Sequence, residues 1–232
     1  MHILLTRPLE DCKELIIKFK SLGHKVSHLP VISVNTIDYI EPNYNEFKGI
    51  IFTSANAIKN LNTSKIDKNI QCFCVGSSTE KIAKESGFQN IFCAEGNVNN
   101  LKEIILQNFD KKNGFLIYIS GEIVSYNLDK DLILEGYSVT RLVNYVAQPI
   151  KEIREEFIKD IKSLIPDIVF IYSENSARNF LNILKKYDLK DEWMETNLMC
   201  LGERASSVLN EIKWKKIFLF NPGEEEFLLY KI

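Results

Sequence analysis

Hydroxyl and amide side chains recur in this sequence directly after short apolar runs. Ser54 follows the run at 50–52, and Ser173 follows the run at 168–172. At a strand-to-helix junction such residues lie beside unpaired backbone N–H groups, which suit carboxylates or phosphates. The pattern therefore predicts binding of an anionic small molecule. The candidate binding residues are Arg7, Ser54, Asn56, Thr79, Ser120, Gly121, Ser173 and Ser176.

These residues also have a simpler explanation. Ser, Thr and Asn are the preferred N-caps, so any one of them could do no more than start its helix. Their recurrence favours binding, because several such loops at the same edges of two facing domains would form a cleft walled by N–H donors. Arg7 adds a permanent positive charge to the first loop.

Motifs for other chemistries are absent from the sequence. It contains no G-x-G-x-x-G, no G-x-x-x-x-G-K-[ST], no H-E-x-x-H and no nucleophile elbow. Its five cysteines are an odd number without zinc-finger spacing, and we interpret Cys72 and Cys74 as core residues. We therefore expect neither a metal nor a cofactor.

The overall composition limits the partners. A formal net charge of −2 gives no reason to expect nucleic acid or an anionic membrane, and the longest apolar runs have the length of strands. The first residues lack the pattern of a signal peptide, so we expect a cytoplasmic protein. No long apolar stripe requires a partner chain, so we expect a monomer.

The elements that position these residues recur along the chain. Segment 49–62 matches 168–182 when aligned on Ser54 and Ser173, and 74–84 matches 200–210 when aligned on Gly76 and Gly202. Segments 3–34 and 115–146 form a second pair. Each segment is interpreted as strand, turn and helix, with a further strand after it. Short apolar strands alternating with helices predict an α/β fold with parallel sheets covered on both faces.

The order of the repeats suggests how they combine. In chain order the repeated segments begin at residues 3, 49, 115 and 168. If the segment that begins at 49 pairs with the segment that begins at 115, one domain spans 36–147. The other domain is then discontinuous and comprises 1–34 and 149–232. Two strands would then cross between the domains, near 31–37 and 142–149. A tandem arrangement of two consecutive domains fits the periodicity almost as well.

Six motifs occur in the order and spacing of a known family. They are I-L-L-T-R-P at 3–8, I-I-F-T-S-A-N-A-I at 50–58, C-V-G-S-S-T-E-K-I-A at 74–83, L-x-x-E-G-Y-S-V at 132–139, I-V-F-I-Y-S-E-N-S at 168–176 and C-L-G-E-R-A-S-S at 200–207. Together they resemble uroporphyrinogen-III synthase over essentially the whole chain. The resemblance implies two flavodoxin-like domains, the first discontinuous, joined by a two-stranded β-ladder, and it argues against the tandem arrangement.

The resemblance also implies a reaction without metal or cofactor. The substrate would be hydroxymethylbilane, a linear tetrapyrrole that is closed with inversion of ring D through a spiro-pyrrolenine, in porphyrin (haem) biosynthesis. Tyr145 matches the tyrosine at the end of the crossing strand, which assists departure of the substrate hydroxyl. Arg7, Ser54, Thr79 and Ser173 match the family's substrate-facing motifs.

The chain departs from the family pattern at two positions. Where many members carry Arg-Gly, this sequence has Ser120-Gly121, which removes a cation from that turn. In the C-terminal copy, Ala205 occupies the position of the family's threonine, with Arg204 and Ser206 beside it.

Two other functions fit part of the pattern. A non-catalytic two-lobed binding protein for a small anion shares the repeats and the cap-rich loops, although such proteins are usually exported. A pair of receiver-like domains would need an acidic cluster at a strand end, and Asp110 and Asp167 are isolated.

Overall fold

The structure is a computed structural model that describes residues 1–221 and 223–230. Within them the chain divides into two compact units. Unit 1 comprises Met1–Ser33 and the chain from Gln148 onward, and unit 2 comprises Val34–Ala147. No helix of the described residues is both long enough and apolar enough to cross a membrane.

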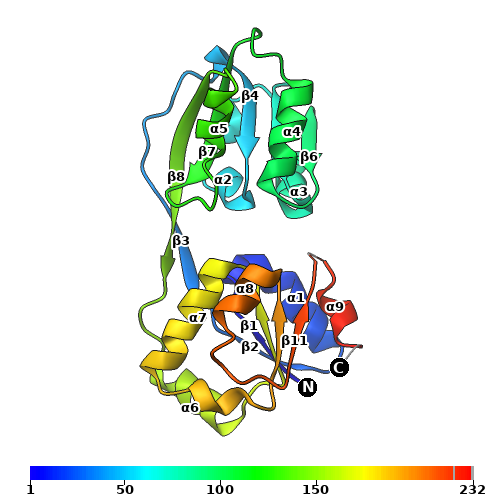
Figure 1. The fold of residues 1–232 in the computed structure, drawn as a ribbon, viewed down its shortest axis with the longest axis vertical. Helices are drawn as coiled ribbons and strands as arrows, with labels where there is room; N and C mark the ends of the chain where they lie inside the picture. Colours follow the sequence, from blue (N-terminus) through cyan, green and yellow to red (C-terminus); the bar gives the residue numbers. More distant parts are fainter. Residues whose placement is uncertain (222, 231–232) are drawn as a thin grey trace. The chain divides into compact units, whose positions relative to one another are not determined.

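Unit 1 contains a parallel sheet with the strand order β11-β10-β9-β1-β2. Figure 1 labels β1, β2 and β11 of this sheet. Its strands are β1 (His2–Leu5), β2 (Lys25–His28), β9 (Ile168–Ile171), β10 (Asn197–Cys200) and β11 (Lys216–Leu219). Its helices are α1 (Leu9–Ser21), α6 (Glu155–Ser163), α7 (Glu174–Lys186), the 3₁₀ helix η3 (Lys190–Trp193), α8 (Glu203–Val208) and α9 (Glu225–Leu228).

Helices cover both faces of the unit 1 sheet. Successive strand residues point to opposite faces, so apolar residues of one strand pack against helices on both sides. Leu4 packs with Phe180 of α7 in the core that also holds residues of α6 and α8. Phe170 faces the other side, where its ring stacks on Phe19 of α1 at 5.9 Å between centroids. This double burial explains why the central strands β1 and β9 are apolar runs in the sequence.

Unit 2 contains a sheet with the strand order β3-β8-β7-β4-β5-β6. Its strands are β3 (Ile32–Thr36), β4 (Phe47–Phe52), β5 (Gln71–Val75), β6 (Ile91–Ala94), β7 (Phe115–Gly121) and β8 (Val139–Pro149). Its helices are α2 (Ala55–Lys59), α3 (Ser77–Glu85), α4 (Val98–Asn108) and α5 (Leu128–Leu134), with the 3₁₀ helices η1 (Tyr44–Glu46) and η2 (Thr63–Lys65).

The unit 2 sheet is likewise buried on both faces. Ile50 packs in the core shared with α2 and α3, whereas Ile51 packs in the core shared with α4 and α5. Gly49 has no room for a side chain, because a Cβ there would lie 2.5 Å from a methyl carbon of Leu116 and 3.0 Å from the ring of Phe109. The tight packing of β4 against β7 and α4 therefore depends on this glycine.

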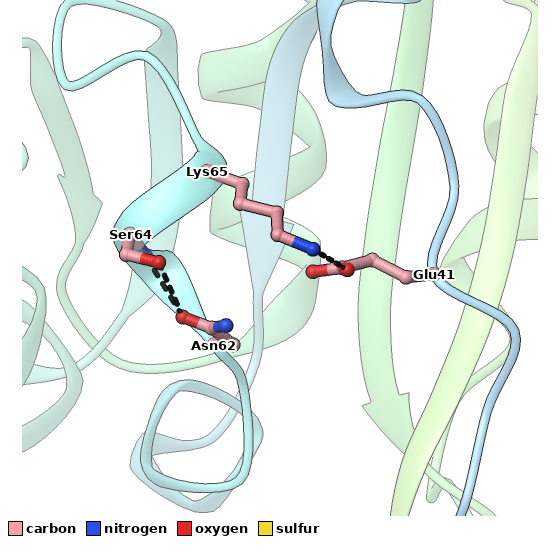
Figure 2. Close-up of polar contacts among 4 residues, drawn as sticks. All are labelled: Glu41, Asn62, Ser64 and Lys65. Carbon is pink, nitrogen blue, oxygen red and sulfur yellow. Dashed lines mark hydrogen bonds and ion pairs between the residues drawn. The ribbon is translucent and has the colours of Figure 1, made fainter.

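The irregular segment after β3 is held to unit 2 by polar contacts. Glu41 forms an ion pair with Lys65 of η2, and Asn62 caps the same 3₁₀ helix by accepting from the Ser64 amide (Figure 2). Thr36 donates to the amide oxygen of Asn60 at 2.6 Å. These contacts connect the crossing chain to the helical side of the unit.

The two units repeat one topology. The order β11-β10-β9-β1-β2 corresponds strand for strand to β6-β5-β4-β7-β8. Strands β3 and β8 pair with each other, and the boundary between the units falls within both. The expected fold class, two open parallel-sheet domains joined by a two-stranded ladder with the first domain discontinuous, is confirmed. The tandem alternative is wrong, because β1 pairs with both β2 and β9.

Candidate functional site

Each sheet has one place where the strand order reverses. In unit 1 the chain builds outward in opposite directions from the neighbours β1 and β9, and in unit 2 from β4 and β7. In open parallel sheets, ligands bind at such switch points, beyond the carboxyl ends of the strands. Five predicted binding residues lie at or directly after these ends: Arg7 and Ser173 in unit 1, and Ser54, Ser120 and Gly121 in unit 2.

The carboxyl edge of unit 1 is tied together by Thr6. Its buried hydroxyl donates to the carbonyl of Phe170 at 2.6 Å and so links the ends of β1 and β9. The guanidinium of Arg7 lies over the ring of Tyr172, 4.6 Å from its centroid, in a cation–π contact. The Arg7 carbonyl is held by the Nε2 atom of His28 at 2.7 Å. The arginine is thus placed at the switch point by both its side chain and its backbone.

Tyr172 is a member of this edge that the sequence did not single out. It is 8% exposed, and its hydroxyl finds no hydrogen-bond partner among the described residues. Burial raises its pKa above the ordinary value, and the nearby Glu225 adds to the rise while Arg7 opposes it. Tyr172 is therefore a neutral, buried hydroxyl below the Arg7 guanidinium. The four apolar residues before it make it look like the end of a core strand, so no local signal marks it.

The N-terminus of α7 is capped by its own serines. Ser173 accepts from the backbone amide of Ser176 at 3.1 Å and donates to the Ser176 hydroxyl at 2.9 Å. Ser176 is buried, so it supports the cap from beneath. The capping explanation therefore holds for both residues, and their contact with a substrate stays a prediction.

A polar groove of about 740 Å³ runs between α7 and α8. It adjoins the first turns of both helices through Glu174 and Arg204. Ala205, where the sequence departs from the family pattern, is 1% exposed and packs in the core, so a methyl group fits its surroundings. The remaining lining residues are Arg178, Leu181, Asn182, Lys185, Ser207, Val208 and Glu211.

The carboxyl edge of unit 2 holds further hydroxyl groups. Thr53 and Tyr118 share a hydrogen bond of 2.9 Å between their hydroxyls, which links the ends of β4 and β7. Ser54 caps α2 by accepting from the Asn56 amide at 3.2 Å. Thr79, in the first turn of α3, is 4% exposed. The predicted hydroxyls are thus present at this edge, but Thr79 presents little surface to a ligand.

Tyr145 and Gly121 are brought into contact. The parallel register of β7 and β8 shifts between Ser120 and Gly121, so that Gly121 pairs with Tyr145. A Cβ on Gly121 would lie 2.8 Å from the tyrosine ring, so the ring occupies the space that a side chain would need. Tyr145 is half-buried, and its hydroxyl donates to no residue in the described parts of the chain. Its contact with a substrate stays a prediction.

Ser120 is buried and its hydroxyl is already bonded. It accepts from Nε of Arg141 at 2.8 Å and donates to the Gly121 carbonyl at 3.1 Å. Nη2 of Arg141 donates to the carbonyls of Gly121 at 2.8 Å and Glu122 at 3.0 Å. The edge therefore carries an arginine from the neighbouring strand, although residue 120 itself is uncharged. Sequence reasoning missed Arg141 because it considered only loops after strands, and Arg141 lies within β8.

The arrangement can bind anions and donate hydrogen bonds. The edge of unit 1 carries the cation of Arg7, and the edge of unit 2, taken by itself, carries the cation of Arg141 and the hydroxyl groups of Tyr145, Thr53 and Tyr118. The described residues hold no group of three or more His, Cys, Asp or Glu side chains that could bind a metal ion. The buried thiols of Cys72, Cys74 and Cys200 have pKa values raised by burial, to about 12 for Cys72 and Cys200, and so are not nucleophiles at neutral pH.

Comparison with known proteins gives a family and a fold. The family model described as Uroporphyrinogen-III synthase HemD matches residues 13–219. A solved structure of uroporphyrinogen-III synthetase from Helicobacter pylori 26695 is similar with a TM-score of 0.65 and 18% identity, covering 100% of this chain and 99% of that one. A mutant uroporphyrinogen III synthase from the extremely thermophilic bacterium Thermus thermophilus is similar with a TM-score of 0.57 and 13% identity, covering 100% and 98%. No curated protein matches the sequence. At these identities the two structures show a shared fold.

Proposed function

The chain belongs to the uroporphyrinogen-III synthase family, and on that premise we propose that it closes hydroxymethylbilane to uroporphyrinogen III. The observation that carries this proposal is the family match, which extends through both units and includes every sequence motif except the one at 3–8. The role of the protein is thus catalytic and belongs to tetrapyrrole biosynthesis.

The proposed reaction releases one water and needs no oxidant or reductant. Ring A loses its hydroxyl, which leaves as water after taking up a proton, and an electrophilic azafulvene remains. The substituted position of ring D attacks this carbon and forms a spiro-pyrrolenine. The original bond between ring D and its neighbour then breaks. That neighbour forms a new bond to the unsubstituted position of ring D. Loss of a proton restores the pyrrole, with ring D inverted.

The main demand on the protein is geometric, because the free substrate closes end to end into the other isomer. Fixing a flexible chain in one reactive geometry supplies catalysis by orientation, and fixed dipoles stabilise developing charge without reorganising. We infer that substrate carboxylates bind at the carboxyl edge of each sheet, to Arg7 and to the amides beside Ser54, Asn56 and Ser173. Thr79, Ser120, Gly121 and Ser176 shape these edges.

We assign to Tyr145 the donation of a hydrogen bond to the departing hydroxyl. Its O–H group has no acceptor in the described parts of the chain, and Gly121 leaves space for its ring. A phenol hydroxyl suits this role, because it can donate a hydrogen bond to the leaving oxygen. We further propose that the protein acts as a monomer in the cytoplasm.

An isomer assay tests the proposed function. The purified protein receives hydroxymethylbilane generated enzymatically in the same vessel, and the products are oxidised and separated into type I and type III porphyrins. We expect type III product at a rate proportional to protein concentration. Type I product alone, at the rate seen without the protein, would rule the enzyme out. Tight binding of the substrate together with that outcome would support the two-lobed binding protein instead.

A further inference from the structure

We propose that Arg141 binds a carboxylate of the substrate at the carboxyl edge of the unit 2 sheet. This inference rests on the proposed function, because it takes the ligand to be a polycarboxylate. It adds a binding residue that comes from the middle of a strand and not from a loop.

The guanidinium of Arg141 is held in a fixed position at the end of β7. In the parallel register Arg141 lies beside Tyr118, and its side chain reaches two residues further along β7. There Nε bonds to the Ser120 hydroxyl at 2.8 Å, and Nη2 bonds to the carbonyls of Gly121 and Glu122 at 2.8 and 3.0 Å. Three bonds from two nitrogens define both the position and the plane of the group.

The partners of Arg141 leave its charge uncompensated. All three acceptors are neutral, and no carboxylate pairs with Arg141 among the described residues. A guanidinium carries five N–H groups, and both N–H groups of Nη1 have no acceptor in the described parts of the chain. Partial burial of a cation without a counter-ion costs free energy, and binding of an anion reduces that cost. A planar guanidinium can bind a carboxylate through two parallel hydrogen bonds.

The location of this cation fits the proposed chemistry. Arg141 bonds to the carbonyl of Gly121, and Gly121 in turn contacts the ring of Tyr145. Arg141 is in register with Tyr118, which packs in the core with α4 and α5, whereas Tyr145 packs against the core with α2 and α3. The two side chains therefore lie on opposite faces of the sheet at the same strand end, so a carboxylate bound to Nη1 would anchor a different part of the substrate from the part beside Tyr145.

A purely structural role is the alternative, in which Arg141 only ties the carbonyls at the end of β7. The two roles differ in whether the positive charge of residue 141 is needed for substrate binding. Glutamine at 141 retains an amide that donates to Ser120 or to a carbonyl, but it has no charge. Lysine retains the charge but loses the planar fork.

The test compares Arg141→Gln and Arg141→Lys with wild type, using hydroxymethylbilane generated in the same vessel. Arg154→Gln is the matched control, because it removes the same charge from an exposed residue at the start of α6 in unit 1. KM, kcat, the dependence of KM on ionic strength and the thermal midpoint are measured for each. We expect Arg141→Gln to raise KM by about tenfold, the effect of losing a hydrogen bond between charged groups, and to weaken the rise of KM with salt. Arg141→Lys should keep the salt dependence, with KM raised by less, and Arg154→Gln should match wild type.

The inference is overturned if Arg141→Gln makes type III product with the KM and salt dependence of Arg154→Gln. It is also overturned if glutamine and lysine raise KM equally, because charge would then play no part. Should Arg141→Gln fail to fold, Arg141→Lys decides: a salt dependence lower than wild type contradicts carboxylate binding. Failure of the proposed function is distinct, because wild type itself would then make no type III product.

Discussion

Tyr172 at the carboxyl edge of unit 1 and Tyr145 at that of unit 2 differ in how their hydroxyls are placed. Tyr172 is buried beneath Arg7, and burial raises its pKa, so its O–H stays protonated and enclosed. Tyr145 is half-buried, and its hydroxyl donates to none of the described residues. Of these two tyrosines, Tyr145 is the less buried, so we propose it for the donor role.

Replacing Tyr145 by phenylalanine should lower kcat with little change in KM or stability. The variant removes the hydrogen bond to the leaving oxygen, which gains charge in the transition state, so kcat should fall by about tenfold or more. The fold loses no donated hydrogen bond. Steady-state kinetics and thermal unfolding measure both effects.

Tyr137→Phe is the matched control for this substitution. Tyr137 lies just before the first residue of β8, whereas Tyr145 lies in the second half of that strand. The Tyr137 hydroxyl donates to the Phe109 carbonyl at 3.3 Å. The control should lose about 1 kcal/mol of stability at most and keep kcat. A kcat for Tyr145→Phe equal to that of the control would remove Tyr145 from the mechanism.

At this scale the sequence predicted the polar residues that follow strands, but not their bonding. Ser120 was expected to contact substrate, whereas its hydroxyl is buried and bonded to Arg141. Arg141 went unnoticed because a side chain can extend along a neighbouring strand, and only the register of β7 and β8 brings it to Ser120. Pairing between distant strands is a tertiary property that local patterns do not contain.

Among the elements, the equivalent helices α2 and α7 start where the sequence repeat predicts, but they differ in length. Both follow a Ser-x-Asn segment, and both begin at its serine as predicted. Yet α7 extends over Glu174–Lys186, whereas α2 ends at Lys59. Asn60 bonds back to the Asn56 carbonyl at 2.8 Å, and Asn62 caps η2. Asparagine side chains compete in this way with the helix for backbone groups, so the helix stops early.

Replacing Ser173 by aspartate separates capping of α7 from binding. Aspartate is an equally good N-cap, so stability should change by less than about 0.5 kcal/mol. Its negative charge at an edge that binds substrate carboxylates should raise KM several-fold, and added salt should reduce the difference. Chemical unfolding and steady-state kinetics measure the two effects.

Asn62→Asp provides the matched control for charge. Asn62 caps η2 and accepts from both the amide and the hydroxyl of Ser64, so aspartate preserves those bonds while adding the same charge before β5 (Figure 2). KM should stay at the wild-type value. An equal KM for Ser173→Asp and Asn62→Asp would show that Ser173 only caps its helix.

For the whole molecule, the sequence left two arrangements of the repeats open. Each repeat predicts a strand, a turn and a helix, and neither the tandem nor the crossed pairing violates any local pattern. The choice depends on the pairing of β1 with β9. In that pairing Ile3 lies opposite Ile168, although most of the sequence separates the two residues. Only the family resemblance, which covers the chain in order, supplied this information in advance.

The discontinuous unit should fold without the segment inserted into it. Val31 donates to the Thr6 carbonyl and Ile150 donates to the Val31 carbonyl, each at 3.1 Å, so the two pieces of unit 1 meet at hydrogen-bonding distance. The two cores of unit 1 are built from its own residues. A chain in which about four Gly and Ser residues join Ser33 to Gln148 should therefore unfold cooperatively in urea, and the shorter connection carries a lower closure cost than the natural one. Residues 34–147 alone, whose ends meet where Ile37 donates to the Asn144 carbonyl at 2.9 Å, serve as the companion fragment. A broad, non-cooperative transition for the fused chain would show that unit 1 depends on unit 2 for its stability.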